Sequence, residues 1–249
     1  MPALHRFQAR VANPDAVRGR DLHWLICSWL NEHGSGHAGA PFAVAPLPSV
    51  ASGVGAFQLG LFPAEDRAAE YEDRLASAIA TCGPLQLGGQ PAELLTSAGA
   101  SLVTELSWEA LWAQGTPRSR WSLRFLTPTT FRSQTSVFVP LPLPTQVFGS
   151  LRRRWITWAP AELGLELTLT PLGLTVEDCE VRTEPIEIPH VGNGLRVRPM
   201  GFTGQVTFRA TWGTAADHAW LDRLARCAEF TGVGAMTAHG LGLTRYLPE

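Results

Sequence analysis

The order of predicted strands and helices repeats once along the chain, and this repeat constrains the fold more than any other feature. Apolar residues that alternate with polar ones indicate strands, and apolar residues at helical spacing indicate helices. The predicted elements of the first half are a strand at 3–12, a helix at 20–32, strands at 41–47 and 55–62, a helix at 64–81 and strand material at 92–106. Those of the second half are a strand at 120–127, a helix at 147–158, strands at 163–170 and 202–208, a helix at 216–230 and a last strand in GLTRYL. Each half has the order β-α-β-β-α-β of a ferredoxin-like fold.

The repeated halves predict an α+β protein of two tandem ferredoxin-like domains with a C-terminal glycine-rich loop. We place the domains at residues 1–115 and 116–249, because the turn signal QGTPRS lies at their junction. A length of 249 residues suits two domains of this size. Hydrophobic residues make up 45% and charged residues 17% of the chain, which excludes a mostly disordered protein.

Neither a membrane segment nor a metal site is expected. No apolar run reaches membrane-spanning length, and the N-terminal residues MPALHRFQARVANPD lack the apolar core of a signal peptide. We therefore expect a soluble cytoplasmic protein without membrane contact. The cysteines have no ligand-like spacing to each other or to histidine, so we expect buried free thiols and no metal. They are Cys27, Cys82, Cys179 and Cys227.

All basic residues of the chain are arginines, and seven of them fall in a segment without acidic residues. The absence of lysine excludes a Walker A motif, a Schiff-base lysine and a lysine general base. The seven are Arg118, Arg120, Arg124, Arg132, Arg152, Arg153 and Arg154. The arginine fork suits phosphate and stacks on bases, so this segment is either a phosphate-binding surface or an ordinary solvated basic face. The net charge of −2 gives no overall attraction to nucleic acid.

The stretch GVGAMTAHGLG, residues 232–242, lies between the last predicted helix and the last predicted strand. It is not a dinucleotide-binding fingerprint, because Thr237 stands where the third glycine would be and because the stretch follows a helix. Its four glycines present backbone N–H groups to phosphate, let another segment pass close by, or form a variable tight turn.

Three separated stretches resemble one known family. They are GFTGQVTF with the later AEFTGVGAMTAHGLG, LRFLTPTTFR with the following PLPLPTQVFGSLRRRW, and PFAVAPL with the histidine-bearing loop before it. Over nearly the whole chain they are similar, in order and spacing, to the CRISPR repeat-processing endoribonucleases of the repeat-associated mysterious protein (RAMP) superfamily. The resemblance implies two ferredoxin-like (RRM-related) domains that bind the repeat of a CRISPR precursor RNA and cut once per repeat. It also implies attack by the 2′-hydroxyl without metal or cofactor, leaving a 2′,3′-cyclic phosphate and a 5′-hydroxyl.

Attack by a 2′-hydroxyl needs a general base near neutral pKa, and histidine is the side chain that fits. Among the seven histidines, His33 and His37 follow the first predicted helix, where the resemblance places this base. His33 comes directly after the helix and is the first candidate, while His37 lies closer to the Pro41–Phe42 pair and is the alternative. Gly34 stands where the family often has an acidic residue.

The resemblance implies that the glycine-rich loop and a basic cleft between the domains position the RNA. Ala235 and Met236 stand where the family often has a basic residue, so arginines have to supply the charge. The predicted RNA-binding residues are the seven arginines named above and, in the loop, Gly232, Gly234, His239, Gly240 and Gly242. His23, in the first predicted helix, is expected to be structural or exposed.

Two other functions remain open. A non-catalytic RAMP subunit that binds guide RNA in a CRISPR interference complex would share the fold, but the histidine loop favours the nuclease. A small-molecule enzyme would need a compact cluster of acid and base groups, which the sequence does not offer. Besides the repeat RNA, the candidate partners are other CRISPR-associated effector subunits and a second copy of the chain.

Overall fold

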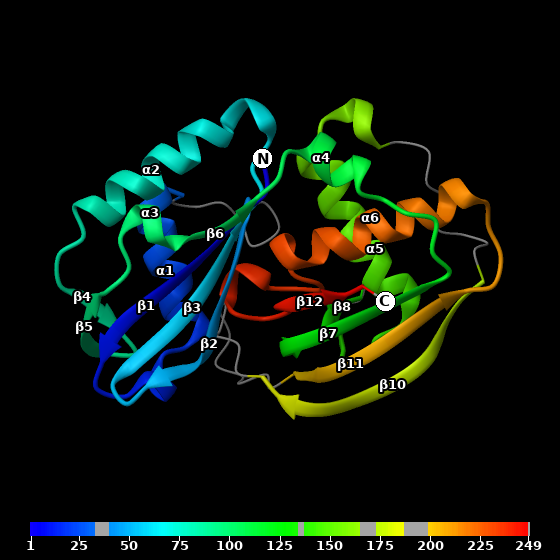
Figure 1. The fold of residues 1–249 in the computed structure, drawn as a ribbon. Coiled ribbons are helices and arrows are strands. Elements are labelled where there is room, and N and C mark those ends of the chain that lie inside the picture. The colour runs from blue at the N-terminus through cyan, green and yellow to red at the C-terminus, as the bar shows by residue number, and fades with distance from the viewer. Residues whose placement is uncertain (33–39, 134–136, 165–172, 187–198, 249) are drawn as a thin grey trace.

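The computed structural model describes residues 1–32, 40–133, 137–164, 173–186 and 199–248. The two halves of the chain form two antiparallel sheets that lie side by side, each with helices packed against it (Figure 1). Four short 3-10 turns connect the larger elements: η1 (Pro14–Ala16), η2 (Glu65–Arg67), η3 (Ala161–Leu163) and η4 (Thr237–His239).

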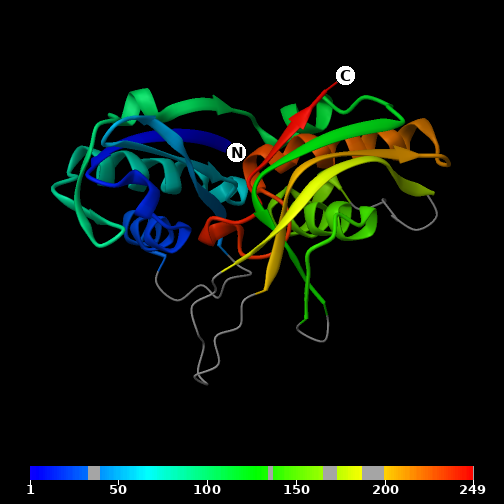
Figure 2. The ribbon, with the colours of Figure 1, turned by 90° about the horizontal axis from the view of Figure 1, so that it is seen from below.

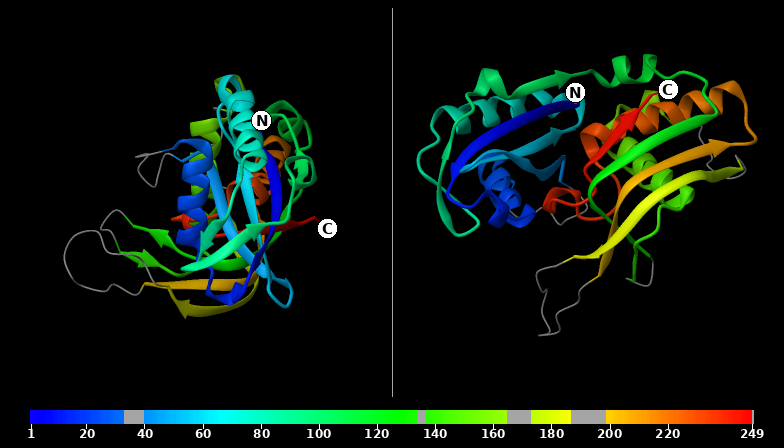
Figure 3. Two further views of the ribbon diagram at one scale, coloured as in Figure 1. Left: turned by 90° about the vertical axis from the view of Figure 1, so that its left-hand side faces the viewer. Right: turned by 60° about the horizontal axis from the view of Figure 1, so that its bottom comes forward.

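The first sheet has the strand order β2-β3-β1-β5-β4, and β6 also pairs with β1. Its strands are β1 (Ala3–Val11), β2 (Phe42–Ala51), β3 (Val54–Leu61), β4 (Leu85–Leu87), β5 (Gln90–Leu94) and β6 (Leu102–Glu105). Its helices are α1 (Gly19–Leu30), α2 (Ala68–Ala80) and the short α3 (Ala98–Ser101). Helices α1 and α2 lie on the same side of this sheet (Figure 3). β3 pairs with one side of β1, while β5 and β6 share the other side, so the last strand of this unit is split in two.

The second sheet has the order β10-β11-β7-β12. Its strands are β7 (Arg120–Thr129), β10 (Leu174–Pro185), β11 (Met200–Ala210) and β12 (Thr244–Leu247), and a separate hairpin is formed by β8 (Phe131–Arg132) and β9 (Phe138–Val139). The helices of this half are α4 (Trp108–Ala113), α5 (Pro144–Trp158) and α6 (Ala215–Thr231). Buried aromatic rings of β7, α5 and β11 fill the space between this sheet and its helices: Trp121, Phe125, Phe148, Trp155, Phe202 and Phe208.

In both halves the first strand is central and the strands pair in ferredoxin-like order, so the predicted fold class is confirmed. The strand predicted at 163–170 lies mostly outside the described residues, and Leu163 belongs to the turn η3. The edge strand β10 was not predicted from the sequence. None of its side chains is buried, so they give no alternation of buried and exposed positions.

The two halves share a packed interface. The backbone of Phe230, near the end of α6, lies directly against Gly60 of β3. Ala238, from the glycine-rich loop, is part of the hydrophobic core of the first half. Trp108 of α4 is part of the core of the second half, although it precedes the predicted junction. The division at residues 115 and 116 therefore stays a prediction, while the contact between the halves is a feature of the fold.

Candidate nucleic-acid site

The glycine-rich loop (residues 232–242) leads from the end of α6 to the start of β12 and lies beside α1 at the junction of the two halves (Figure 2). Its glycines all have positive φ angles: 64° at Gly232, 89° at Gly234, 93° at Gly240 and 70° at Gly242. At Gly240 an added Cβ would stand 2.6 Å from the Cα of Gly19, the first residue of α1. The segment that passes so close to this glycine is therefore part of the protein itself.

Several backbone N–H groups of the loop are used within the protein. Gly234 N donates to the Ser150 hydroxyl on α5 (3.2 Å), and Gly232 N donates to the carbonyl of Ala228 (2.9 Å). Gly242 N donates to a carbonyl at the end of β7 (3.0 Å). These glycines fix the shape of the loop. Their predicted contact with RNA is untested, and it would have to use atoms other than these N–H groups.

Arg154 holds the loop from α5. Its guanidinium Nη2 donates to the carbonyl of Gly234 (2.7 Å) and to the hydroxyl of Thr237 (3.1 Å). Burial lowers the pKa of this guanidinium to about 10, which still leaves it charged at neutral pH. Because Ser150 lies one helical turn earlier, both side chains reach the loop from one face of α5. Arg154 was predicted to bind RNA, and the structure gives it a contact within the protein.

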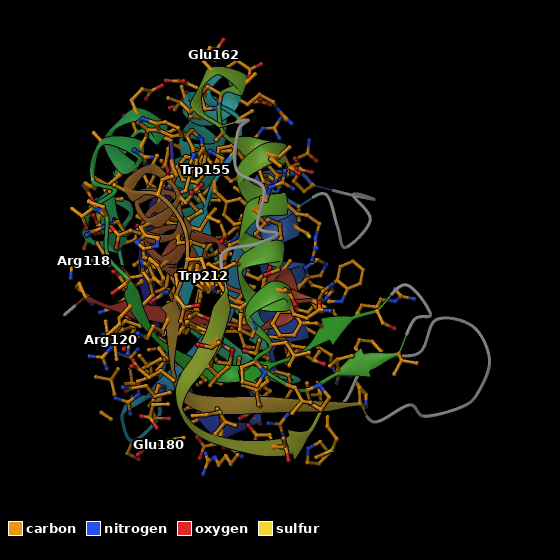
Figure 4. All side chains as sticks on the ribbon, turned by 90° about the vertical axis from the view of Figure 1, so that its right-hand side faces the viewer. Arg118, Arg120, Trp155, Glu162, Glu180 and Trp212 are labelled. Atoms are coloured by element: carbon orange, nitrogen blue, oxygen red, sulfur yellow. The ribbon has the colours of Figure 1, made fainter. Side chains whose placement is uncertain are left out.

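Arg118 and Arg120 also have partners within the protein. Arg118 Nε donates to the Thr116 hydroxyl (3.0 Å) and lies 3.8 Å from an oxygen of the buried Asp222, while Arg120 Nε donates to Glu177 (2.6 Å). The two arginines lie on one side of the second half, with the β8–β9 hairpin projecting on the other (Figure 4). The acid-free segment of the sequence therefore acquires acidic neighbours from distant parts of the chain.

The remaining arginines of the segment lie closer to solvent. Arg124, Arg132 and Arg153 are exposed, and Arg152 is half-buried. Arg124 of β7 stands directly opposite Arg245 of β12, and both side chains are exposed. Like charges at opposed strand positions cost stability. Arg245 is a basic residue that was not selected from the sequence, and its charge also acts on the carboxyl of Glu229.

A pair of stacked histidines joins α1 to the loop. The ring of His23 lies 3.7 Å, centroid to centroid, from the ring of His239, and its Nδ1 is 3.0 Å from the carbonyl oxygen of Ala238. A carbonyl only accepts, so Nδ1 carries a proton. His23 Nε2 lies 3.6 Å from the sulfur of Cys27, and burial raises the pKa of that thiol, so it stays protonated. The ring of Phe42, at the start of β2, lies 5.9 Å from that of His23. His23 was expected to be either structural or exposed, and these contacts make it structural. Its stacking on His239 was not predicted.

The candidate catalytic residues His33 and His37 lie outside the described residues. The chain before them is anchored: Arg74 of α2 donates to the carbonyl of the last residue of α1 (2.7 Å). Glu32, the last described residue on this side, accepts a hydrogen bond from the hydroxyl of Tyr71. Within the described ranges, no group of three or more histidine, cysteine or carboxylate side chains is arranged to hold a metal ion. In the same part of the chain, no helix is long and apolar enough to cross a membrane.

Comparison with known proteins identifies the family. The sequence model of the CRISPR-associated endoribonuclease Cas6 family matches residues 123–244, from β7 through the glycine-rich loop to β12. The chain belongs to the Cas6 family. Among curated proteins, no sequence matches it significantly.

Solved Cas6 structures share the fold over the whole chain. A product complex of Cas6 (TTHB231) is 26% identical, with a TM-score of 0.78, and the match covers 99% of this chain and 100% of that one. A product complex of Cas6 (TTHA0078) is 25% identical, with a TM-score of 0.77 and complete coverage of both chains. Thermus thermophilus Cas6 (TTHB231) is 25% identical, with a TM-score of 0.67 over 99% of this chain and 98% of that one. Similarity to the Cas6 fold therefore extends beyond the segment that the family model matches.

Proposed function

We propose that this Cas6-family protein is a metal-independent endoribonuclease that binds the repeat of a CRISPR precursor transcript and cuts once in each repeat. The observation that carries the proposal is the family match, which spans β7, α5, β11, α6 and the loop that they hold. The similarity to two Cas6 proteins in product complexes supports it. The cytoplasmic location, other effector subunits and a second copy of the chain as partners remain predictions from the sequence.

In the proposed reaction a general base removes the proton of the 2′-hydroxyl beside the scissile phosphate. The 2′-oxygen attacks phosphorus, the bond to the 5′-oxygen breaks, and the products carry a 2′,3′-cyclic phosphate and a 5′-hydroxyl. Histidine suits the base because its pKa lies near neutrality. His33 is the first candidate and His37 the alternative. Because the nucleophile belongs to the substrate, no metal-bound water is needed to supply one.

Binding of the RNA phosphates needs cationic side chains. The seven arginines fall into two groups according to their contacts within the protein. Arg154 holds the glycine-rich loop, and Arg118 and Arg120 contact polar or acidic groups of the protein. We infer that the exposed Arg124 and Arg153 make stronger contacts with phosphate. The exposed Arg132 and the half-buried Arg152 stay in the predicted binding set, as do the loop residues Gly232, Gly234, His239, Gly240 and Gly242.

The test is cleavage of a labelled CRISPR repeat RNA by the wild-type protein and by two matched single variants, His33→Ala and His37→Ala. We expect His33→Ala to slow cleavage by about 10²-fold or more, the usual contribution of a general base, while the Kd for the repeat stays nearly unchanged. His37→Ala serves as the control. If only His37→Ala loses activity, His37 is the base. Tight binding by a wild-type protein that never cuts the repeat would overturn the nuclease and support the non-catalytic RAMP subunit.

A further inference from the structure

His239 ends the turn η4, and its backbone is fixed on both sides. Its N–H donates to the carbonyl of Met236 (2.9 Å), and Met236 has a φ angle of 61°, which is uncommon for a residue with a side chain. Two residues before His239, Thr237 accepts a hydrogen bond from Arg154. Directly after it, Gly240 packs against the first residue of α1. Strained backbone that is held this firmly tends to be kept at functional sites.

The ring of His239 is also held in place. It stacks on His23, which is buried and has both ring nitrogens close to protein groups: Nδ1 to the Ala238 carbonyl and Nε2 to the Cys27 thiol. His23 thus gives the ring of His239 a buried surface to stack on. His239 is only half-buried, so it is the member of the pair that reaches the surface.

The proposed cleavage needs a second proton-transfer group, because the departing 5′-oxygen must gain a proton. The chain has no lysine and two tyrosines. The Tyr246 hydroxyl donates to Asp222 (2.5 Å) and the Tyr71 hydroxyl donates to Glu32. Burial and these carboxylates raise the pKa of both phenols well above the ordinary value, which makes them poor acids at neutral pH. Histidine is the remaining side chain whose ordinary pKa suits the task.

Two other described histidines have contacts of a different kind. His5 is buried on β1, between the Ser101 hydroxyl (3.2 Å) and Glu72 (3.3 Å). His218 lies near the start of α6, with its Nε2 3.2 Å from the carbonyl oxygen of Trp212. Neither belongs to the glycine-rich loop. His239 does belong to it, and the ring of Phe42, the first residue of β2, lies 5.9 Å from the ring of its stacking partner His23.

We propose that His239 is a second catalytic residue of the nuclease proposed above and acts as its general acid. As the bond from phosphorus to the 5′-oxygen breaks, the electron pair stays on that oxygen, and the imidazolium of His239 gives it a proton. The group that took the proton of the 2′-hydroxyl is a different one. After each turnover His239 is neutral and the base is protonated, and exchange with water restores both. This role rests on the proposed function, since it has meaning only if the protein cuts RNA.

The test uses two repeat RNAs that differ in one atom. In one of them sulfur replaces the 5′-oxygen at the scissile phosphate, and a thiolate leaves without prior protonation because its conjugate acid has a low pKa. His239→Phe keeps a ring for stacking on His23 but has no proton to give, and His239→Gln is a second, polar variant. We expect both to cut the oxygen substrate about 10²-fold more slowly than wild type and the sulfur substrate at nearly the wild-type rate.

The controls separate this role from a structural one. The variant that lacks the general base, His33→Ala or, for the alternative, His37→Ala, should be slow on both substrates, because loss of the base affects attack on either. If the His239 variants are slow on both substrates, or cut the oxygen substrate like wild type, His239 is not the general acid. Melting temperatures and Kd values for the repeat show whether each variant is folded and binds. A wild-type protein that fails to cut the oxygen substrate would instead refute the proposed function itself.

Discussion

Arg154 lies among the predicted phosphate-binding arginines, but its contacts assign it to the glycine-rich loop. Substitution of Arg154 by methionine keeps the aliphatic part and removes two hydrogen bonds, to Gly234 and Thr237. Hydrogen bonds from a charged group contribute about 1.5–3 kcal/mol each. Release of a buried charge offsets part of that loss. We therefore expect Arg154→Met to lower the free energy of unfolding by about 2–4 kcal/mol.

For a chain of this length, 1 kcal/mol shifts Tm by roughly 2–4 °C, so the melting temperature should fall by about 5–15 °C. The matched control is Arg153→Met, which changes an exposed arginine on the same helix and should cost less than about 0.5 kcal/mol. Thermal unfolding followed by circular dichroism measures both. Equal melting temperatures for the two variants would refute the role of Arg154 in holding the loop.

The same pair of variants separates binding from stability. Removal of an arginine that contacts phosphate lowers the slope of log K for RNA binding against log salt concentration by about one unit. We expect Arg153→Met to lower the slope and Arg154→Met to leave it unchanged, at a temperature where both variants are folded. The opposite result would return Arg154 to the RNA-binding surface.

The contacts of Gly240, of Asp222 and of the arginine segment each have a measurable consequence. Gly240→Ala should destabilise the fold by at least about 2 kcal/mol more than Gly89→Ala in denaturant unfolding: both glycines have positive φ, but only at Gly240 would the new Cβ meet backbone. Equal losses would contradict the close approach to α1. Burial alone would raise the pKa of the Asp222 carboxyl, but hydrogen bonds from Tyr246 and neighbouring groups lower it below its ordinary value. The ionised Asp222 therefore stabilises the fold above the unfolded pKa of about 3.9, and this stabilisation is lost as pH falls through the folded pKa. Asp222→Asn should be less stable at pH 7 and lose less stability on acidification, and an unchanged profile from pH 7 to pH 3 would contradict this. The affinity for RNA should fall with salt, but with a smaller log–log slope than seven arginine–phosphate contacts would give, because some of the seven arginines of 118–154 contact the protein instead. An affinity that does not change with salt would argue against RNA binding by these arginines.

Much of the architecture could be predicted because burial leaves a periodic pattern. The helix predicted at 216–230 is α6, and the strand predicted at 202–208 lies within β11, where buried side chains recur along the element. β10 has no such pattern, since none of its side chains is buried. Its existence depends on pairing with β11, which is a property of the folded sheet.

The sequence predicts which types of residue form the candidate site, but only some of the contacts that these residues make. Glycine density indicated a close approach, yet the sequence could not tell that α1 of the first half approaches Gly240. Arginine clustering indicated phosphate binding, yet Arg120 and Arg154 have protein partners that are remote in sequence. The stacking of His23 on His239 joins the two halves, and no local signal announces such a contact.

The proposed function requires that this protein cuts CRISPR repeat RNA by attack of the 2′-hydroxyl. The most direct measurement is incubation of the wild-type protein with a labelled repeat in the presence of EDTA, followed by mass analysis of the product ends. We expect one cut per repeat, with a 2′,3′-cyclic phosphate on the upstream fragment and a 5′-hydroxyl on the downstream one. A repeat that stays intact in EDTA, or fragments that end in a 3′-hydroxyl and a 5′-phosphate, would contradict it.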